Sequence, residues 1–464
     1  MHRSIPRAAR ARGPAAYIQP CFSPACDGWY NTRRALKLRL QFEEEVASTM
    51  NRSEEPGIVI IGLGPAGLMA LEGIRDHDPD VPVTIVSGEP HYAYFRPRLS
   101  HLLGSEIAPE RIAVKPPAWY GDRRAEVLLG RMARAIDAER REVVLDDDAR
   151  LPARAIVLAC GSRPFMPPLP GLDREGVFAL RTAADAQAIT RACRRAREVC
   201  VVGAGPLGLE AAWALAKLDL TVHLLEHGPR LLGKILDEQA SQMLSDIVAR
   251  AGIKLHLAAS SESVTARGVR LASGEEIPGE VVLFSTGVRP NLDLAESAAI
   301  RVNRGVVVDS MMRTSQPWIH AAGDVAEFAG APGGTWPVAM AQGKVAGANA
   351  AGAIADNALI EYKAVPPSYT LMVMGTRIFT IGDVQDQAGA TAVVSEDAAR
   401  GIRRKLVLSG GRLVGGLLFG DLAKFDKVRD GIERRIELPE AGPVPAPDYD
   451  QIMDMLIGAL APAQ

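Results

Sequence analysis

Residues 58–67 read IVIIGLGPAG, and residues 199–208 read VCVVGAGPLG. Each stretch is a short apolar run without polar alternation, as expected of a strand buried on both faces, followed by a Gly-x-Gly-x-x-Gly sequence. A helical stretch and a second apolar strand come next, at residues 68–75 and 83–86 in the first case and at 209–217 and 221–225 in the second. This internal repeat predicts two β-α-β units in an α/β chain.

Each glycine sequence stands in the context that separates a dinucleotide fingerprint from an ordinary βα turn. Both follow a strand, open a helix and meet an acid near the end of the next strand, Glu89 in the first unit and Glu226 in the second. The first glycine permits a tight turn, the second lets the backbone approach a pyrophosphate, and the third lets helix and strand pack closely. The helix N-terminus adds free N–H groups and a positive dipole end. We therefore predict one dinucleotide on Gly62, Gly64, Pro65, Ala66 and Gly67 and another on Gly203, Gly205 and Gly208.

Two dinucleotide sites in one chain indicate redox chemistry, with a tightly held flavin and an exchangeable nicotinamide nucleotide as the expected pair. A length of 464 residues predicts two or three domains. Hydrophobic residues at 47% and charged residues at 23% are typical of a soluble globular protein. The net charge of −2 gives no general affinity for nucleic acid or anionic membranes. No apolar run approaches the roughly 18 residues of a membrane span.

The five cysteines form neither a CxxC pair nor a dense framework; they are Cys21, Cys26, Cys160, Cys193 and Cys200. This pattern fits a reducing compartment better than a disulfide-stapled secreted protein, so we expect a cytoplasmic location. No cysteine cluster suits haem or iron–sulfur ligation, and we predict no metal site.

Residues 1–49 differ from the rest of the chain. Arginine and lysine recur through them, whereas Asp27 is the single acid before Glu43, and no apolar segment like that of a secretory signal appears. An Arg-rich organelle transit peptide is one interpretation. The favoured one places the natural start at Met50, just before the first strand. Under both, residues 1–49 are a basic extension without a fold of their own.

Three later segments carry a resemblance to a known family: residues 159–164 (ACGSRP), 285–291 (STGVRPN) and 322–326 (AGDVA). In this order they resemble motifs of the two-dinucleotide-binding-domain flavoproteins, or pyridine nucleotide oxidoreductases. The resemblance runs from residue 58 to about 439. It implies FAD on the first glycine loop and a nicotinamide nucleotide on the second. The further cofactor-binding residues that it implies are Ala159, Gly161, Gly287, Gly323 and Asp324.

The resemblance gives roles to two parts of this late region. Asp324 is expected to accept hydrogen bonds from the ribityl hydroxyls of the flavin. A helix that begins near Trp336 and contains Gln342 is expected to point its N-terminus at the flavin ring, where the helix dipole stabilises the negative charge of a reduced flavin.

The resemblance also implies the domain order. The FAD-binding domain is split between residues 50–175 and 292–355, and the NAD(P)H-binding domain, 176–291, lies between these parts. Residues 359–464 resemble the small α+β C-terminal domain of the rubredoxin-reductase and nitrite-reductase branch. Its expected strands are residues 369–374, 378–381, 404–408 and 413–418, with helix after them.

The segment of residues 92–103 decides the branch because it contains no cysteine. Disulfide reductases and thiol peroxidases of the family carry cysteine here, so a thiolate relay beside the flavin is excluded at this position. The segment instead resembles the Y-x-[RK]-P-x-L-S signature of rubredoxin reductases. By this resemblance Arg96 lies near the flavin ring, where a cation favours hydride acceptance, and Pro97 makes the approach to the flavin rigid. The alternative is a solvated loop arginine.

The preference for NADH rests on charge. Glu226 should accept hydrogen bonds from the ribose hydroxyls and would repel a 2′-phosphate, so NADPH is the less favoured coenzyme. Arg230 is the cation that could compensate for this repulsion. Glu210 matches a family position near the nicotinamide carboxamide, although a carboxylate in the first turn of a helix is also favourable by itself. The ribose contact of Glu89 is less secure, because Ser87 and Gly88 separate it from the strand.

We therefore expect hydride transfer from NADH to FAD and then electron transfer to an external acceptor, either a rubredoxin- or ferredoxin-type protein or a small molecule. The alternatives are the flavoprotein component of a nitrite reductase system and an NADH-sensing regulatory flavoprotein. One interpretation of Arg400, Arg403, Arg404 and Lys405 is a basic docking patch for an acidic carrier, and the other is a solvated face. Assembly into a homo-oligomer is left open.

Overall fold

The computed structural model describes residues 56–104, 108–355, 358–364, 366–386, 388–438 and 448–460. The interpretations of residues 1–49 concern a stretch outside these ranges. Within the described residues, no helix is both long and apolar enough to cross a membrane.

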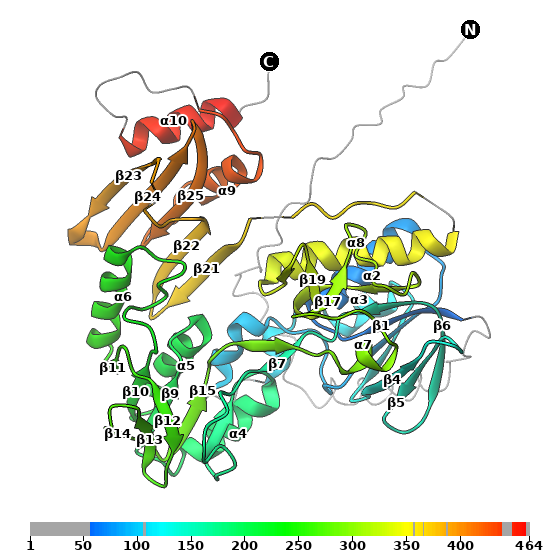
Figure 1. Ribbon diagram of the computed structural model, residues 1–464, viewed down its shortest axis with the longest axis horizontal. Coiled ribbons are helices and arrows are strands. Elements are labelled where there is room, and N and C mark those ends of the chain that lie inside the picture. Colours follow the sequence, from blue (N-terminus) through cyan, green and yellow to red (C-terminus); the bar gives the residue numbers. More distant parts are fainter. Residues whose placement is uncertain are drawn as a thin grey trace. The chain divides into compact units, whose positions relative to one another are not determined.

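The first glycine loop lies at the carboxyl end of the central strand of a mixed sheet (Figure 1). The strand order is β3 (Ala125–Leu129), β2 (Val83–Ser87), β1 (Gly57–Ile61), β6 (Arg150–Leu158), β5 (Glu142–Leu145) and β4 (Ala133–Asp137), with β18 (Ile319–Ala321) paired to β6. β1 runs parallel to β2 and β6, and helix α2 (Pro65–His77) connects β1 to β2. Ile58 and Ile60 of β1 are completely buried. The first predicted β-α-β unit is therefore present, with its strand covered on both faces.

The second glycine loop occupies the same place in a five-stranded parallel sheet. Its order is β11 (Lys254–His256), β10 (Thr221–Leu225), β9 (Glu198–Val202), β15 (Val281–Phe284) and β8 (Val177–Ala179). Helix α5 (Pro206–Ala216) connects β9 to β10 and completes the second predicted unit. Helices α4 (Ala183–Cys193) and α6 (Glu238–Arg250) and a small antiparallel sheet of β12 (Ser261–Val264), β13 (Gly268–Leu271) and β14 (Glu276–Pro278) belong to the same part of the chain.

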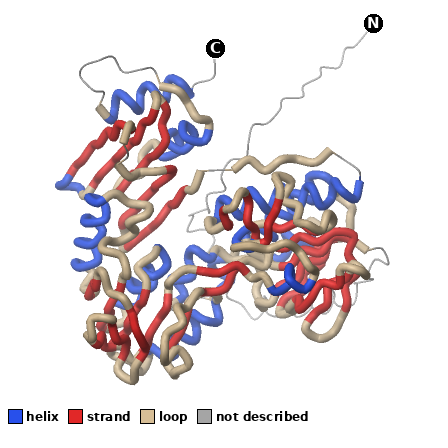
Figure 2. Tube along the Cα trace, viewed as in Figure 1, coloured by secondary structure: helices blue, strands red, loops and turns tan. Residues whose placement is uncertain are grey.

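The C-terminal strands form one antiparallel sheet. Its order is β21 (Ser368–Val373), β22 (Thr376–Gly382), β25 (Arg412–Phe419), β24 (Ile402–Ser409) and β23 (Ala390–Asp397). Helices α9 (Phe425–Glu433) and α10 (Tyr449–Leu460) pack against it (Figure 2). The four expected strands are confirmed, but β23 was missed. It is an edge strand in which Val393 is the single buried residue, so it has almost no hydrophobic pattern to detect.

The remaining elements lie between these strands along the chain, and the longest of them is a 20-residue helix. They are η2 (Arg96–Leu102), η3 (Pro109–Ile112), α3 (Pro117–Gly121), β7 (Ser162–Pro164), β16 (Val288–Pro290), α7 (Asp293–Ser297), β17 (Val306–Val308), η4 (Gly323–Val325), β19 (Ala326–Phe328), β20 (Ala331–Pro332), α8 (Trp336–Ala355) and η5 (Ala398–Arg400). β7 and β16 pair antiparallel and carry the chain from the first sheet to the second and back. The α/β fold class is thereby confirmed.

Helix α8 packs unusually closely on α2, because glycines stand where the two backbones meet. A Cβ atom at Gly347 would lie 2.0 Å from the Ala70 carbonyl oxygen, and one at Gly343 would lie 2.2 Å from that of Ala66. From the other side, a Cβ at Gly73 would lie 2.1 Å from the Lys344 carbonyl oxygen. This packing brings the N-terminus of α8 beside the first glycine loop.

We expect Gly347→Ala to lower the free energy of unfolding by about 1–3 kcal/mol, because the added methyl group pushes the two helices apart. Chemical denaturation of the purified variants measures the change. Gly458→Ala is the matched control, since Gly458 lies in α10 with nothing within 4 Å of its Cβ position. It should change stability by less than about 1 kcal/mol, in the stabilising direction. Equal effects of the two substitutions would contradict the close packing.

Candidate functional site

The first glycine loop has the backbone geometry of a diphosphate-binding turn. Gly62 has a φ of +108°, and a Cβ atom there would lie 2.2 Å from the Ala159 carbonyl oxygen. A Cβ at Gly67 would lie 2.0 Å from the Gly62 carbonyl oxygen, whereas nothing lies within 4 Å of the Cβ position of Gly64. Gly64 caps α2 without a side-chain hydrogen bond, and Pro65 begins the helix. Open space above uncapped amide groups fits the diphosphate of a dinucleotide.

The second loop repeats this geometry closely. Gly203 has a φ of +102°, and its Cβ would lie 2.4 Å from the Ser285 carbonyl oxygen. A Cβ at Gly208 would lie 2.0 Å from the Gly203 carbonyl oxygen, and the space around Gly205 is again open to 4 Å. Helix α5 likewise starts without a side-chain cap. The chain therefore presents two anion sites of the same design.

Asp324 lies where α2, α8 and η4 meet. Gly323 has a φ of +79°, and its Cβ position is 3.0 Å from the Cβ of Ala66 in the first turn of α2. The Gly323 amide donates to the buried Oε1 of Gln342 at 2.9 Å, which fixes the loop to α8. Just before α8, the hydroxyl of Thr335 is buried and has no partner among the described residues. It is an unused polar group at the place where the flavin is predicted.

Arg181 is a residue of this site that the sequence analysis missed. Its Nη2 donates to the Asp324 carboxylate at 2.9 Å and to the Ser162 hydroxyl at 2.8 Å, and its Nε donates to the Ser162 carbonyl oxygen at 3.1 Å. Arg181 immediately precedes the capping box of α4, in which Asp185 accepts from the amides of Arg181 and Thr182. The capping box is the feature that the sequence could have shown. It predicts the start of a helix, but not the direction of the Arg181 guanidinium.

Glu89 and Arg96, predicted as separate cofactor ligands, are joined in an ion pair. The Tyr94 hydroxyl donates to Glu89 at 2.5 Å, and Nη1 of Arg96 donates to the Tyr94 oxygen at 3.0 Å and to the Arg181 carbonyl oxygen at 2.9 Å. Burial by itself would lower the pKa of Arg96, but Glu89, Tyr94 and Asp324 together outweigh it and the pKa is raised. Arg96 is thus a fixed cation and the interpretation as a solvated loop arginine is wrong.

The segment around Pro97 reaches the start of α8. Pro97 stands in the first turn of η2, and the ring of Phe95 packs edge-on against that of Trp336 with centroids 4.8 Å apart. The predicted flavin-side residues Arg96, Pro97, Asp324 and Trp336 therefore come from three segments that contact one another.

Ala159, Gly161 and Gly287 hold the crossing between the sheets. The Gly161 carbonyl oxygen accepts from the Asn291 amide at 3.0 Å, and that of Gly287 accepts from the Phe165 amide at 2.9 Å. Both glycines have positive φ, +67° and +96°. Ala159 borders the first glycine loop at Gly62, and the Cβ position of Gly161 lies 3.7 Å from Nη2 of Arg181.

Glu210 connects the two units. It lies in α5, directly after the second glycine loop, and accepts a hydrogen bond from the Ser100 hydroxyl of η2 at 2.8 Å. Burial raises the pKa of Glu210 to about 7, although the Ser100 hydrogen bond and the charge of Arg98 oppose this shift. The segment that carries Arg96 thus meets the predicted nicotinamide side of the second unit.

Glu226 is held over the second glycine loop by backbone amides. Its Oε2 accepts from the Ala204 amide at 3.1 Å, and its Oε1 accepts from the Gly228 amide at 2.7 Å. Arg230 points to other partners: its Nη2 donates to the Gly233 carbonyl oxygen at 3.0 Å and to Oε1 of Gln385 at 2.9 Å.

The described cysteines are not arranged for thiol chemistry. Cys160, Cys193 and Cys200 are free thiols. Burial raises the pKa of Cys160 to about 12, that of Cys193 to about 11 and that of Cys200 further still, so all three stay protonated. In the part of the chain that the structure describes, no three His, Cys, Asp or Glu residues gather as metal ligands.

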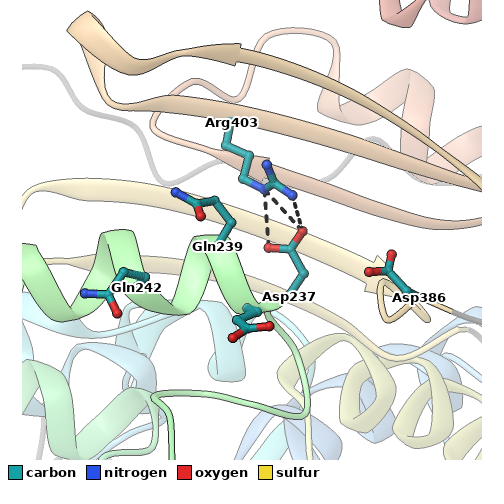
Figure 3. A pocket seen from close by; sticks show the side chains of 6 residues that line it. Asp237, Gln239, Gln242, Asp386 and Arg403 are labelled. Atoms are coloured by element: carbon teal, nitrogen blue, oxygen red, sulfur yellow. Dashed lines mark hydrogen bonds and ion pairs between the residues drawn. The ribbon is translucent and has the colours of Figure 1, made fainter.

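Neither interpretation of the charge run at residues 400–405, a docking patch or a solvated face, holds for Arg403 and Lys405. Arg403 and Lys405 alternate with Arg404 along β24, so they face the opposite side of the sheet, where both are buried. Nη2 of Arg403 pairs with the Asp237 carboxylate at 2.5 Å (Figure 3), and Nζ of Lys405 lies 3.4 Å from it. Arg404 pairs with Asp421. The charge run was misread because a strand sends successive side chains to opposite faces.

Two dinucleotide folds that meet through Glu210 and Ser100 define a two-dinucleotide redox protein. The chain belongs to the pyridine nucleotide-disulphide oxidoreductase family, which matches residues 56–343, more than half of its length. Residues 367–436 match the rubredoxin NAD+ reductase C-terminal domain. The resemblance stated from the motifs is confirmed.

Several relatives have a named activity. The ferredoxin–NAD(+) reductase component of the anthranilate 1,2-dioxygenase system of Burkholderia cepacia is 33% identical over 86% of this chain and 97% of that protein. The assimilatory nitrate reductase electron transfer subunit of Bacillus subtilis is 29% identical over 82% of this chain and 50% of its own length. The structure of NADH:rubredoxin oxidoreductase from Clostridium acetobutylicum has a TM-score of 0.70 at 26% identity and covers 86% of this chain and 99% of that one. The chain spans about half the length of the nitrate and nitrite reductase relatives.

The open space at Gly64 and Gly205 gives a pair of matched variants. Gly64→Val should leave the fold intact, as judged by circular dichroism, but give colourless protein because the side chain fills the predicted position of the FAD diphosphate. Gly205→Val should stay yellow and need about tenfold more NADH for half-reduction, since charge-assisted hydrogen bonds to the diphosphate are lost. Loss of FAD from the Gly205 variant and its retention in the Gly64 variant would reverse the assignment of the two loops.

Glu210→Gln should change how stability depends on pH. The folded protein holds the Glu210 proton up to about pH 7, whereas the unfolded chain releases it near 4.5, the ordinary value. The proton's contribution to stability is therefore complete below pH 4.5 and is lost as the pH rises to 7. Gln has no proton to lose, so we expect the variant's Tm to rise relative to wild type between pH 5 and pH 8. Glu437→Gln, at an exposed carboxylate, is the control; parallel profiles for the Glu210 variant and wild type would contradict the raised pKa.

Proposed function

We propose that the chain is an FAD-dependent NADH oxidoreductase that passes electrons to an external acceptor. Under this proposal residues 50–175 and 292–355 bind FAD, 176–291 bind NADH, and 359–464 form the C-terminal domain. The observation that carries the proposal is the contact of Glu210 with Ser100, because it joins the segment that carries Arg96 to the helix that follows the second open diphosphate loop. FAD, when bound, supplies the redox chemistry by taking a hydride from reduced nicotinamide and giving up its electrons to an acceptor.

The chain's own residues bind, orient and tune this chemistry. The amides of the first loop would hold the diphosphate of FAD, and Asp324, positioned by Arg181, would accept hydrogen bonds from the ribityl hydroxyls. Arg96 keeps a positive charge beside the flavin, which favours hydride acceptance, and the N-terminus of α8 adds to the same effect. Since Glu210 has a pKa of about 7, it can hold or release a proton beside the nicotinamide at neutral pH.

NADH is the proposed coenzyme, with NADPH less favoured. The Glu226 carboxylate is fixed over the second loop by two amides, at the place where a ribose would lie. A 2′-phosphate would meet this negative charge, and Arg230 is committed to other acceptors. These contacts support selection of NADH.

The proposed acceptor is a small redox protein of the rubredoxin or ferredoxin type. The names of two relatives state such acceptors, and the buried, protonated thiols of the described cysteines give electrons no route through a disulfide. The half-length match to the nitrate and nitrite reductase proteins supports the alternative of a nitrite reductase component. The NADH-sensing alternative and the cytoplasmic location stay predictions, and assembly into a homo-oligomer stays open.

FAD-loaded protein should be yellow, and NADH should bleach the flavin absorption under anaerobic conditions faster than NADPH does. Stopped-flow reduction measures both rates. Reduced protein mixed with rubredoxin, ferredoxin or ferricyanide should then return to yellow, fastest with the best acceptor. A protein that cannot be loaded with FAD contradicts the proposal. Rapid reduction followed by slow turnover with every acceptor would favour the NADH-sensing function.

A further inference from the structure

The loop that follows Glu226 is held from outside its own sheet. Residues 227–237 connect β10 to α6, and Arg230 lies four positions after the acid that is proposed to bind the NADH ribose. An arginine near this position is what proteins use to accept a 2′-phosphate. The orientation of Arg230 therefore matters for the choice of coenzyme.

The guanidinium of Arg230 already has three acceptors. Nη2 donates to the Gly233 carbonyl oxygen at 3.0 Å and to Oε1 of Gln385 at 2.9 Å, and Nη1 donates to the Leu236 carbonyl oxygen at 3.4 Å. Gln385 belongs to the loop after β22 of the C-terminal domain, and its Nε2 donates to the same Leu236 oxygen at 3.0 Å. The single amide group thus binds both the cation and the turn that surrounds it.

Two further hydrogen bonds fix the turn that carries Gln385. The backbone N–H of Gln385 donates to the Asp383 carboxylate at 2.9 Å. The next residue, Asp386, accepts from Nζ of Lys405 at 2.6 Å. Lys405 has a side chain that is 2% exposed, and together with Arg403 it contacts Asp237, the N-cap of α6 at the end of the same loop.

Figure 3 shows Arg403 reaching Asp237, with Asp386 to one side of this pair. The three residues line a pocket of about 350 Å³. Burial would raise the pKa of Asp237, but Arg403, the Ala240 amide and Lys405 together outweigh this and lower it, so the carboxylate stays charged. The C-terminal domain therefore contacts the loop at two points. Gln385 binds Arg230, and Arg403 and Lys405 form buried ion pairs with Asp237.

We propose that Gln385 is a specificity-determining residue, which favours NADH by holding Arg230 away from the position of a 2′-phosphate. This inference rests on the proposed function. A guanidinium that is free to turn would offer a 2′-phosphate a charge-assisted, bidentate contact and offset the repulsion from Glu226. Held by Gln385 and two carbonyl oxygens, it must break these bonds first. The choice of coenzyme would then be made partly by a domain that does not bind the coenzyme.

The test is the ratio of kcat/KM for NADPH to kcat/KM for NADH, measured on FAD-loaded full-length protein with ferricyanide as acceptor. Gln385→Ala should raise this ratio about tenfold, the value of one charge-assisted hydrogen bond. Gln385→Glu keeps an acceptor for Arg230 and should leave the ratio at or below that of wild type. In an Arg230→Ala background, Gln385→Ala should leave the ratio unchanged.

Arg412→Ala is the control in the same domain, because it removes an exposed ion pair with Glu437 far along the sequence from the loop. An unchanged ratio in Gln385→Ala, including an equal loss with both coenzymes, would overturn the inference. So would a rise that persists without Arg230. Calorimetry tests the same inference without catalysis. Gln385→Ala should raise the affinity for 2′-phospho-ADP-ribose relative to that for ADP-ribose. If the wild type binds these ligands but is not reduced by NADH, the proposed function is wrong. The role of Gln385 is then decided by the ratio of the two ligand affinities in Gln385→Ala and wild type.

Discussion

Both nucleotide folds depend on one steric constraint, the contact between the first and third glycine of each loop. At Gly67 and Gly208 a Cβ atom would lie 2.0 Å from the carbonyl oxygen of the first glycine. Only without that atom does the helix begin directly above the end of the strand, with its first amides turned to open space. The same rule recurs between α2 and α8, where Gly343 and Gly347 let two backbones meet. The predicted flavin site thus depends on glycines, whose missing side chains let the backbone segments pack closely.

Charged side chains then connect the segments that surround the predicted flavin site. Arg181 binds Asp324, and its carbonyl oxygen receives Arg96, which is paired with Glu89. Each of these groups lies on a different segment, and each would be costly to bury without its partner. The network therefore ties the predicted flavin ligands into one unit before any cofactor is considered. Glu210, in contrast, has a raised pKa because it is buried, and its hydrogen bond from the neutral Ser100 hydroxyl opposes this shift without cancelling it.

Much of the site could be predicted from the sequence because it depends on local rules. The fingerprints, the acid at Glu226 and the strand-to-loop placement of Asp324 follow from patterns within about 30 residues, where strand, turn and helix chemistry act. The basic run at residues 400–405 was misread for the opposite reason. Whether a strand residue faces solvent or another domain depends on what covers the sheet, and Asp237 lies 166 positions from Arg403.

The sequence by itself determined the two β-α-β units, their glycine loops and the absence of a cysteine in residues 92–103, since each is a matter of residue type and spacing. Tertiary structure alone decided the partners: Ser100 for Glu210, Arg181 for Asp324 and Gln385 for Arg230. These contacts join residues that are 110, 143 and 155 positions apart. No local propensity encodes such pairs, because they exist only once packed sheets and helices have brought distant segments within hydrogen-bonding distance.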